Sequence, residues 1–471
     1  MIKTYKLSSI EDNFDSIFGD SEPEWMRQFR KDASLNYEKL PFEVSQLYTK
    51  YSNANRLLPD KIFFDETKEN QDVSIFSDRI AELSKGNGIV CKNGGIVNTF
   101  LNDDLKKRGL VISKISEALN EYSDIIQKHL TKNKLDFKED RFLALCSAAF
   151  KHGFFIYVPK NMVIDEPIRI INYLSERGSS SISRNIIISE SNSKATVVQE
   201  LYSANIKNKE IQQVYFELMD AHLMNNSQLE MVTLQSLDYQ AVNFSNRKSF
   251  VEQDANMSWS IGLFGSQLSR YKIDSIMQGQ GASVEDVEII FGIDNQSFDI
   301  SSNLIHSAPN TKGRVLVKSV MKDTSQSLFK GMIKINKNAK STESYLAGHA
   351  ILLDKGAKSD AIPGLEIESN EVKATHSASV SQIDEKQIFY LMSRGLSRES
   401  AKREIVGGFL EPISRRMGPT IRAWINYLIE NKWLGKPLIL RTDEAMEQIL
   451  EVEKTRYRET EDIFEKHYKY R

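Results

Sequence analysis

The sequence predicts a mainly β protein with helical segments at both ends. Between about residues 154 and 381, short runs rich in Val, Ile, Phe and Thr alternate with small polar turns, a pattern typical of strands. The regions before and after it instead show apolar residues at helical spacing. No helical pattern separates most of the strand-like runs, which excludes a doubly wound α/β sheet, because that fold needs helical crossovers. A sandwich, a barrel or a β-solenoid remains.

Residues 1–155 form the first predicted unit, which is mostly helical. An apolar stripe at four-residue spacing begins at Trp25, as on one side of an amphipathic helix. Apolar spacing predicts a second helical stretch over 103–130. A third runs from about 140 to 152 and is expected to stop at Gly153, since glycine commonly follows the last turn of a helix.

Residues 156–382 form the central unit and hold the predicted strands. Its strand-like runs include NIIISE, ATVVQELY, VEIIFGI and RVLVKSV. Small polar turns separate them, such as Ser191-Asn192-Ser193 and Asn225-Asn226-Ser227, and these residue types favour turns. Several turns are followed by a small residue that starts the next strand, as in KNAKS and KGAKS, and this recurrence favours stacked coils.

Residues 383–471 form the third predicted unit, which is helical again. Ser397 is expected to cap a helix in which apolar residues recur every four positions, and Pro412 is expected to kink or end that helix. The chain then closes with a densely charged segment, EKTRYRETEDIFEKHYKYR. Its interspersed opposite charges predict a solvent-exposed helix.

Composition excludes several classes of function. The 471 residues are 40% hydrophobic and 27% charged, which are ordinary values for a globular protein. The formal net charge of −2 offers no basic field for nucleic acid. No apolar run reaches the length of about 18 residues that a membrane span needs. The N-terminus lacks the apolar stretch of a signal peptide, so the cytoplasm is the expected location.

Motifs for a self-contained enzyme site are absent from the sequence. There is no GxxxxGK[ST] phosphate loop, so the chain is not expected to hydrolyse ATP, and there is no HExxH or GxSxG motif. The two cysteines make neither a disulfide framework nor a CxxC metal site. Cys91 lies in a strand-like run and Cys146 in an apolar helical one, so both are expected to be buried. The prediction is a protein that is not an enzyme.

Residues 371–395 are the most informative stretch of the chain. They read EVKATHSASVSQIDEKQIFYLMSRG, a strand-like alternation that carries His376, followed by an acidic turn and an aromatic-led helix. Taking every second residue places His376 on an apolar face with Val372, Ala374, Ala378 and Val380. Such a face is covered either by the inside of the fold or by another protein. On the residues alone, a histidine hydrogen-bonded in the core is the simplest interpretation.

Four stretches, in order along the chain, resemble the SufB/SufD family, the scaffold subunits of iron–sulfur cluster assembly. They are EPEWMRQFR (22–30), HGFFIYVPKNMVIDEPI (152–168), NLIHSAPNTKGRVLVKSVMKDTSQSLFKGMIKI (303–335) and PGLEIESNEVKATHSASVSQIDEKQIFYLMSRG (363–395). The resemblance implies a right-handed parallel β-helix between two helical ends. That fold agrees with the helix–strand–helix layout and selects the solenoid from the three open architectures.

Within this family the chain looks like SufD rather than SufB. SufB-type chains carry a cysteine on the closing coils of the β-helix and a glutamate directly after the histidine. Here Ser377 follows His376, the expected cysteine position falls near Gly348, and no cysteine occurs after Cys146. A thiolate ligand therefore cannot come from this part of the chain.

The resemblance to SufD implies two kinds of partner. The chain would pair with a SufB-like paralogue through the closing coils. Each of the two would bind one copy of the ABC ATPase SufC through its C-terminal helical region, here about residues 385–417, and closure of the ATPase pair would twist the heterodimer. The residues expected to make or support the ATPase contact are Phe389, Tyr390, Arg394, Phe409 and Leu410.

The cargo that the resemblance implies is a nascent iron–sulfur cluster, shared transiently with SufB. No cofactor is expected to bind this chain tightly by itself. His376 is the predicted cluster ligand at the SufB interface, because neutral imidazole can ligate iron. His349, beside the missing cysteine position, is a second candidate. His306 is expected to make a structural hydrogen bond instead.

Three other interpretations remain open. One is a homodimeric SufB/SufD-type scaffold that works without a SufB partner, although the missing cysteine argues against it. Another is a metal-free β-helix adaptor, in which His376 belongs to the core. The third is a carbohydrate-active β-helix enzyme, but such enzymes need carboxylates or basic residues clustered on an exposed sheet and are usually secreted.

Overall fold

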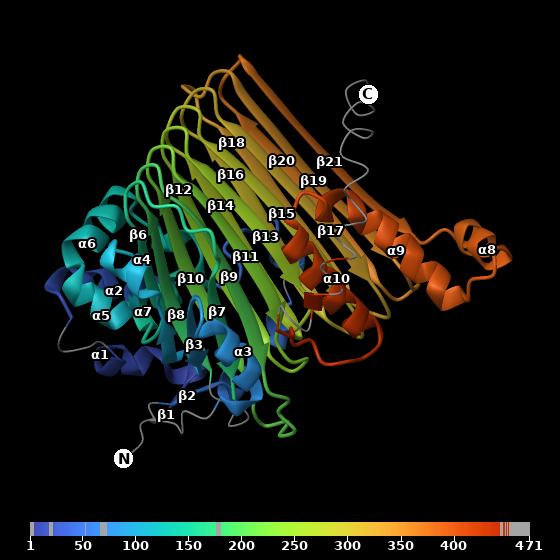
Figure 1. Ribbon diagram of the computed structural model, residues 1–471, viewed down its shortest axis with the longest axis horizontal. Coiled ribbons are helices and arrows are strands. Elements are labelled where there is room, and N and C mark those ends of the chain that lie inside the picture. Colours follow the sequence, from blue (N-terminus) through green and yellow to red (C-terminus); the bar gives the residue numbers. More distant parts are fainter. Residues whose placement is uncertain are drawn as a thin grey trace.

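The computed structural model describes residues 4–17, 22–51, 53–65, 73–175, 180–442, 446, 447, 449 and 451. These residues form a parallel β-solenoid with helices at both ends, as the sequence predicts (Figure 1). In this part of the chain no helix is long and apolar enough to cross a membrane. The charged segment 453–471 lies outside the described residues, so its helix stays a prediction.

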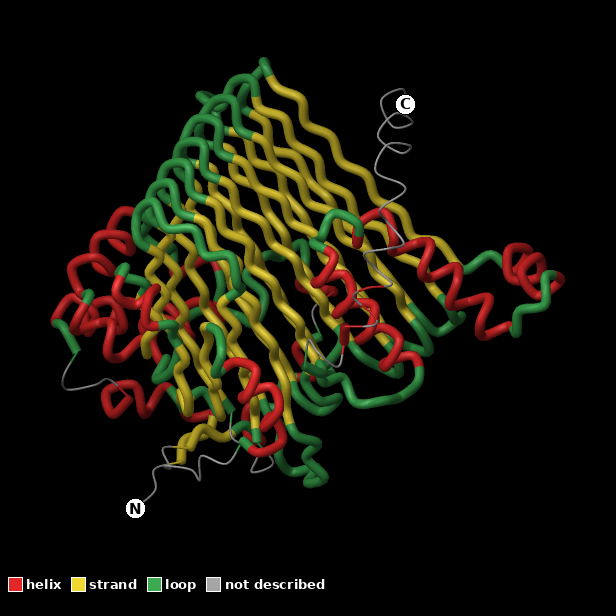
Figure 2. Tube along the Cα trace, viewed as in Figure 1, coloured by secondary structure: helices red, strands yellow, loops and turns green. Residues whose placement is uncertain are grey.

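Two sheets build the solenoid, and the chain alternates between them in every coil. Figure 2 shows the strands stacked side by side with the helices outside the stack. Sheet I contains, in spatial order, β5 (Val111–Lys114), β6 (Phe154–Val158), β8 (Ser181–Ser189), β10 (Val214–Leu223), β12 (Val242–Val251), β14 (Leu268–Met277), β16 (Ser297–His306), β18 (Gln326–Ile335) and β20 (Lys358–Ile367).

Sheet II faces sheet I across the core. It contains, in spatial order, β4 (Gly95–Phe100), β3 (Asn87–Lys92), β7 (Ile168–Leu174), β9 (Lys194–Ser203), β11 (Gln228–Ser236), β13 (Asn256–Leu263), β15 (Ser283–Gly292), β17 (Lys312–Met321), β19 (Thr342–Leu352) and β21 (Val372–Gln382). A separate antiparallel pair joins β1 (Thr4–Lys6) to β2 (Phe63–Asp65).

Asparagine side chains explain how one row of corners turns so tightly. Asn192 and Asn226 have φ angles of 60° and 59°, a left-handed conformation that asparagine tolerates better than most residues. Their amides also stack along the solenoid: Asn226 donates to Asn192 at 2.9 Å, and Asn192 donates to Asn161 at 2.8 Å. The predicted turns at these asparagines are therefore confirmed, with the side chains adding a ladder between coils.

The inside of the solenoid is mainly apolar but holds a few charged groups. Arg247 and Glu217 form a fully buried ion pair at 2.8 Å. Further along, Asp286 and Glu288 lie two residues apart on β15 and are both buried, with Ser302 of β16 donating to Glu288. Buried charges need such partners, because removing them from water is costly.

The N-terminal helices cover the outer face of the first strands of sheet I. Phe142 packs between them and the sheet, with its ring centroid 4.3 Å from that of Phe244. Figure 1 shows these helices gathered at one end of the solenoid, except α3, which lies beside sheet II. They are α1 (Phe14–Ile17), α2 (Glu24–Tyr37), α3 (Ser77–Leu83), α4 (Asp103–Lys107), α5 (Ile115–Glu121), α6 (Ser123–Lys132) and α7 (Arg141–Ala149).

The continuous helical stretch predicted over 103–130 is wrong in its middle. Gly109, with φ of +95°, follows α4, and the chain then forms strand β5 before α5 begins. Ile112 lies opposite Ile156 in an antiparallel pairing with β6. Residues 111–114 thus extend sheet I, because pairing with β6 satisfies their backbone groups better than an isolated helical turn would.

The C-terminal helices are α8 (Glu385–Ser393), α9 (Arg398–Ser414) and α10 (Pro419–Trp433). Helices α9 and α10 pack on the outer face of sheet II in one apolar cluster. Ser397 caps α9 as predicted, accepting from the amide of Ser400. Pro412 lies in the last turn, and α9 ends two residues after it. Helix α8 projects away from the solenoid, as Figure 1 shows.

Candidate functional site

The final coil of the solenoid, β20 and β21, leaves its core uncovered. Strand β20 pairs only with β18, and β21 only with β19, so no described strand lies beyond them. Leu365 and Ile367 continue the inward rows of the buried Ile333 and Ile335 but are 39% and 42% exposed. In any earlier coil these positions would be core, so this end of the solenoid presents an apolar surface.

His376 belongs to this uncovered face. It is in register with Leu346 of β19, which is fully buried inside the solenoid, so His376 also points to the inner side of sheet II. Val372 and Ala374 on the same side pack against the core, which confirms the predicted apolar face. The side chain of His376 is exposed and makes no hydrogen bond with another described residue, so it is not a buried core histidine.

His349 lies on the opposite face of sheet II. It is in register with Ser379, three residues after His376, and an odd separation reverses the side of the sheet. Its Nδ1 is 2.7 Å from Ser379 Oγ. Burial and the nearby Lys318 lower the pKa of His349. The structure therefore does not bring the two candidate ligands together within one chain.

The position near which a SufB-type cysteine is expected has no room for one. A Cβ on Gly348 would lie 2.2 Å from the ring of Phe329, which fills this part of the core. The two cysteines of the chain are both buried elsewhere, as predicted, and burial raises the pKa of Cys91 to about 12. Any thiolate at the final coil must come from another protein.

The five residues predicted to contact an ATPase separate into two groups. Phe389 and Tyr390 of α8 are 74% and 56% exposed, and Arg394 donates to the Tyr390 hydroxyl at 3.3 Å. Leu410 is buried against sheet II, and Phe409 is half-buried there with its carbonyl accepting from Lys318. The first three residues are available to a partner, whereas the last two hold α9 in place.

Three of the remaining histidines, His129, His222 and His306, have structural surroundings. His306 is bonded to Thr311 at 2.8 Å and to Ser344 at 3.0 Å, as expected, and burial lowers its pKa to about 4. His129 and His222, which have no sequence signal, are buried against each other with ring centroids 5.0 Å apart. This contact joins α6 to β10.

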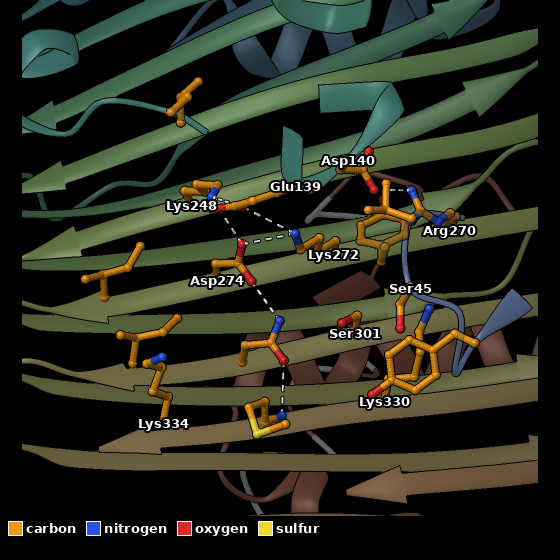
Figure 3. Close-up of a pocket in the computed structure, with 18 of the residues that line it drawn as sticks. Ser45, Glu139, Asp140, Lys248, Arg270, Lys272, Asp274, Ser301, Lys330 and Lys334 are labelled. Atoms are coloured by element: carbon orange, nitrogen blue, oxygen red, sulfur yellow. Dashed lines mark hydrogen bonds and ion pairs between the residues drawn. The ribbon is translucent and has the colours of Figure 1, made fainter. Parts of the chain in front are cut away.

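Sequence reasoning also missed a charged groove on the outer face of sheet I, shown in Figure 3. Its floor is made by strands β12, β14, β16 and β18, and its walls by residues 43–48 and 134–140. The groove has a volume of about 630 Å³. Alternating charges such as those of Arg270, Lys272 and Asp274 resemble an ordinary solvated strand face, so only the covering segments reveal a cavity.

Comparison with known proteins agrees with this architecture. The family model described as the SufBD core domain of SUF-system FeS cluster assembly matches residues 172–409, and the model of the SufBD N-terminal region matches residues 6–170. Iron–sulfur cluster assembly SufBD family proteins of Staphylococcus haemolyticus, Staphylococcus epidermidis and Staphylococcus aureus are each 27% identical to the chain, over 88% of it and 90% of their own length. With both models matched in order, the chain belongs to the SufBD family of iron–sulfur cluster assembly proteins.

Proposed function

We propose that this chain is a SufD-type, non-catalytic scaffold subunit that pairs with a SufB-like paralogue and binds a SufC-like ATPase. The observation that carries the proposal is the final coil, where an exposed histidine stands on an uncovered inner face of the solenoid. A partner that caps this face buries the exposed Leu365 and Ile367, a gain of about 25 cal/mol for each Å² of apolar surface covered.

The proposed role of His376 is to help hold a nascent iron–sulfur cluster between the two subunits. Its imidazole is accessible and has no hydrogen bond with another described side chain, so a ring nitrogen is open to a metal. Because Cys91 and Cys146 are buried, the thiolates for the same cluster come from the paralogue. His349 contributes no second ligand to this cluster, since it faces the other side of the sheet.

Helix α8 is the proposed ATPase-binding element. Exposed aromatic residues often anchor protein–protein contacts, and Phe389 and Tyr390 are the most exposed large apolar side chains among the described residues after β21. Helices α9 and α10 hold α8 on a base packed against sheet II. Movement of α8 by a bound ATPase would therefore also move the strands of sheet II, which carries His376.

The test is co-expression with SufB-like and SufC-like proteins from the same organism and purification without oxygen, followed by iron and sulfide analysis. Wild type is expected to yield a complex with a cluster. His376→Ala should keep the complex and lose the cluster, whereas His349→Ala, the matched control on the other face, should keep both. Equal cluster content in both variants would refute the role of His376, and a chain that purifies alone as a metal-free dimer would favour the adaptor.

A separate variant tests the ATPase contact. Phe389→Ala is expected to weaken binding of the SufC-like protein by about tenfold or more, a usual effect of removing an aromatic anchor. Pairing with the SufB-like protein should be unchanged, because α8 lies apart from the uncovered face. Unaltered ATPase binding would remove α8 from the proposal.

A further inference from the structure

The groove on the outer face of sheet I has no part in the scaffold role. His376 and helices α9 and α10 belong to or pack on sheet II, whereas the groove lies across β12, β14, β16 and β18 of sheet I. Its volume of about 630 Å³ is within the range of small-molecule sites. The covering segment 43–48 and the loop 134–140 make it concave.

The groove is lined by six basic and five acidic side chains. The acidic residues are Glu43, Glu139, Asp140, Asp274 and Asp299, and the basic residues are Lys134, Lys248, Arg270, Lys272, Lys330 and Lys334. Most of these charges are committed to close ion pairs. Arg270 lies 2.6 Å from Asp140, Lys330 2.6 Å from Asp299 and Lys248 2.7 Å from Glu139.

Lys272 has only longer contacts with these carboxylates. Its ammonium nitrogen is 3.5 Å from Glu139 and 3.6 Å from Asp274, and it makes no hydrogen bond with another described residue. Both carboxylates lie closer to Lys248, at 2.7 and 3.3 Å. Burial disfavours the charge of Lys272, but Asp274 and Asp140 raise its pKa, so it is a cation at neutral pH. Its hydrogen-bonding capacity is available to a ligand.

Strand register places a hydroxyl between two ammonium groups. Lys272, Ser301 and Lys330 are partners on the neighbouring strands β14, β16 and β18, so they form one row across the floor with about 4.8 Å between strands. The side-chain hydroxyl of Ser301 has no hydrogen bond with another described residue. Figure 3 shows it between the two lysines, and Ser45 of the covering segment lines the same groove.

We propose that this groove binds a small organic anion, with carboxylate or phosphate oxygens held by Lys272 and Ser301. An oxyanion accepts from the ammonium and the hydroxyl together, and charge-assisted bonds of this kind are stronger than neutral ones. Tyr48 and Phe250 also line the groove and offer apolar surface to the rest of such a molecule. The site is independent of the proposed cluster site.

The test is isothermal titration calorimetry of the purified full-length chain with citrate and with inorganic phosphate, at constant ionic strength in chloride. At least one probe is expected to bind with a dissociation constant of about 1 mM or lower. Binding of citrate alone identifies a carboxylate site, and binding of phosphate alone identifies a phosphate site. Failure of both probes to bind would overturn the proposal.

Three variants locate the binding. Lys272→Gln and Ser301→Ala should each weaken it, the first by about tenfold or more, since a charge-assisted bond is lost. Lys334→Gln is the matched control, because Lys334 lines the same groove but is paired with Glu366 at 2.6 Å. Ser301→Ala leaves every ion pair in place, so it decides the question even if Lys272→Gln folds poorly. If wild type and Ser301→Ala bind the probe with equal affinity, or if Lys334→Gln loses as much affinity as Lys272→Gln, the proposal is overturned.

Discussion

The buried carboxyl pair inside the solenoid makes stability depend on pH in a defined direction. Burial raises the pKa of Glu288 to about 7, from an ordinary value of 4.5, despite the hydrogen bond from Ser302 and the positive charge of Arg247. Burial and the neighbouring Glu288 also raise the pKa of Asp286. Charging both of two neighbouring buried carboxylates is costly, because each loses hydration and the two repel.

At Glu288 the folded protein therefore holds more protons than the unfolded chain between about pH 4.5 and 7, and the contribution of this group to stability falls as the pH rises through this window. At 1.4 kcal/mol for each pH unit, a carboxyl pKa raised from 4.5 to about 7 corresponds to roughly 3 kcal/mol lost by pH 8 from Glu288 alone. Glu288→Gln removes this titration and keeps an oxygen that accepts from Ser302.

The assay is urea unfolding of wild type and Glu288→Gln at pH 5 and pH 8. We expect the variant to lose less stability over this range than wild type, by roughly 3 kcal/mol. Glu285→Gln is the matched control on the same strand, because Glu285 points outward and pairs with Arg416 at 2.6 Å. If Glu288→Gln and wild type lose equal stability between the two pH values, the reasoning is wrong.

Three more predictions concern single positions. Lys432→Met should destabilise the protein by roughly 2–4 kcal/mol and speed hydrogen exchange in α10, because the buried side-chain nitrogen donates to two carbonyls and one side-chain amide oxygen, and each of these acceptors would lose this donor. Gly348→Ala should lower the free energy of unfolding by about 1–3 kcal/mol in thermal unfolding, since the added Cβ meets a core ring. Gly407→Ala should instead raise it by about 0.5–1 kcal/mol, because a Cβ there meets no atom within 4 Å and alanine favours the helix. Changes of the same sign in both variants would contradict the packing. His129→Gln should reduce the loss of melting temperature between pH 6.5 and 4. Burial lowers the pKa of His129 to about 4, so as the pH falls this histidine is protonated in the unfolded chain before it is protonated in the folded protein, and the folded state loses stability. A variant with the same pH profile as wild type would argue against this.

Much of the fold could be predicted because local and overall signals agree. Asparagine turns at Asn192 and Asn226 recur after strand-like runs, and the same positions carry the left-handed backbone of the corners. The continuous helix predicted over 103–130 is wrong for the opposite reason, because the local and long-range signals disagree there. Its apolar spacing fits a helix, but pairing with β6, more than forty positions along the chain from Ile112, decides its conformation.

The candidate site could be predicted only in part. The apolar face around His376 follows from alternation within one strand, and the structure confirms it. Whether His349 shares that face depends on the register between β19 and β21, which aligns Leu346 with His376 and so sets His349 on the other side. Register between coils is a long-range property, and no single segment of the sequence encodes it.

Because the coils are stacked, the stability of a strand depends on its position along the solenoid axis. Each strand in the middle of the solenoid is held by neighbours on both sides, whereas β20 and β21 have one neighbour each. In such quasi-one-dimensional folds, stability is close to a sum of coil and nearest-neighbour terms, so opening starts at an uncapped end. A protein that docks on the final coil supplies the missing neighbour, and folding of that coil then becomes coupled to assembly.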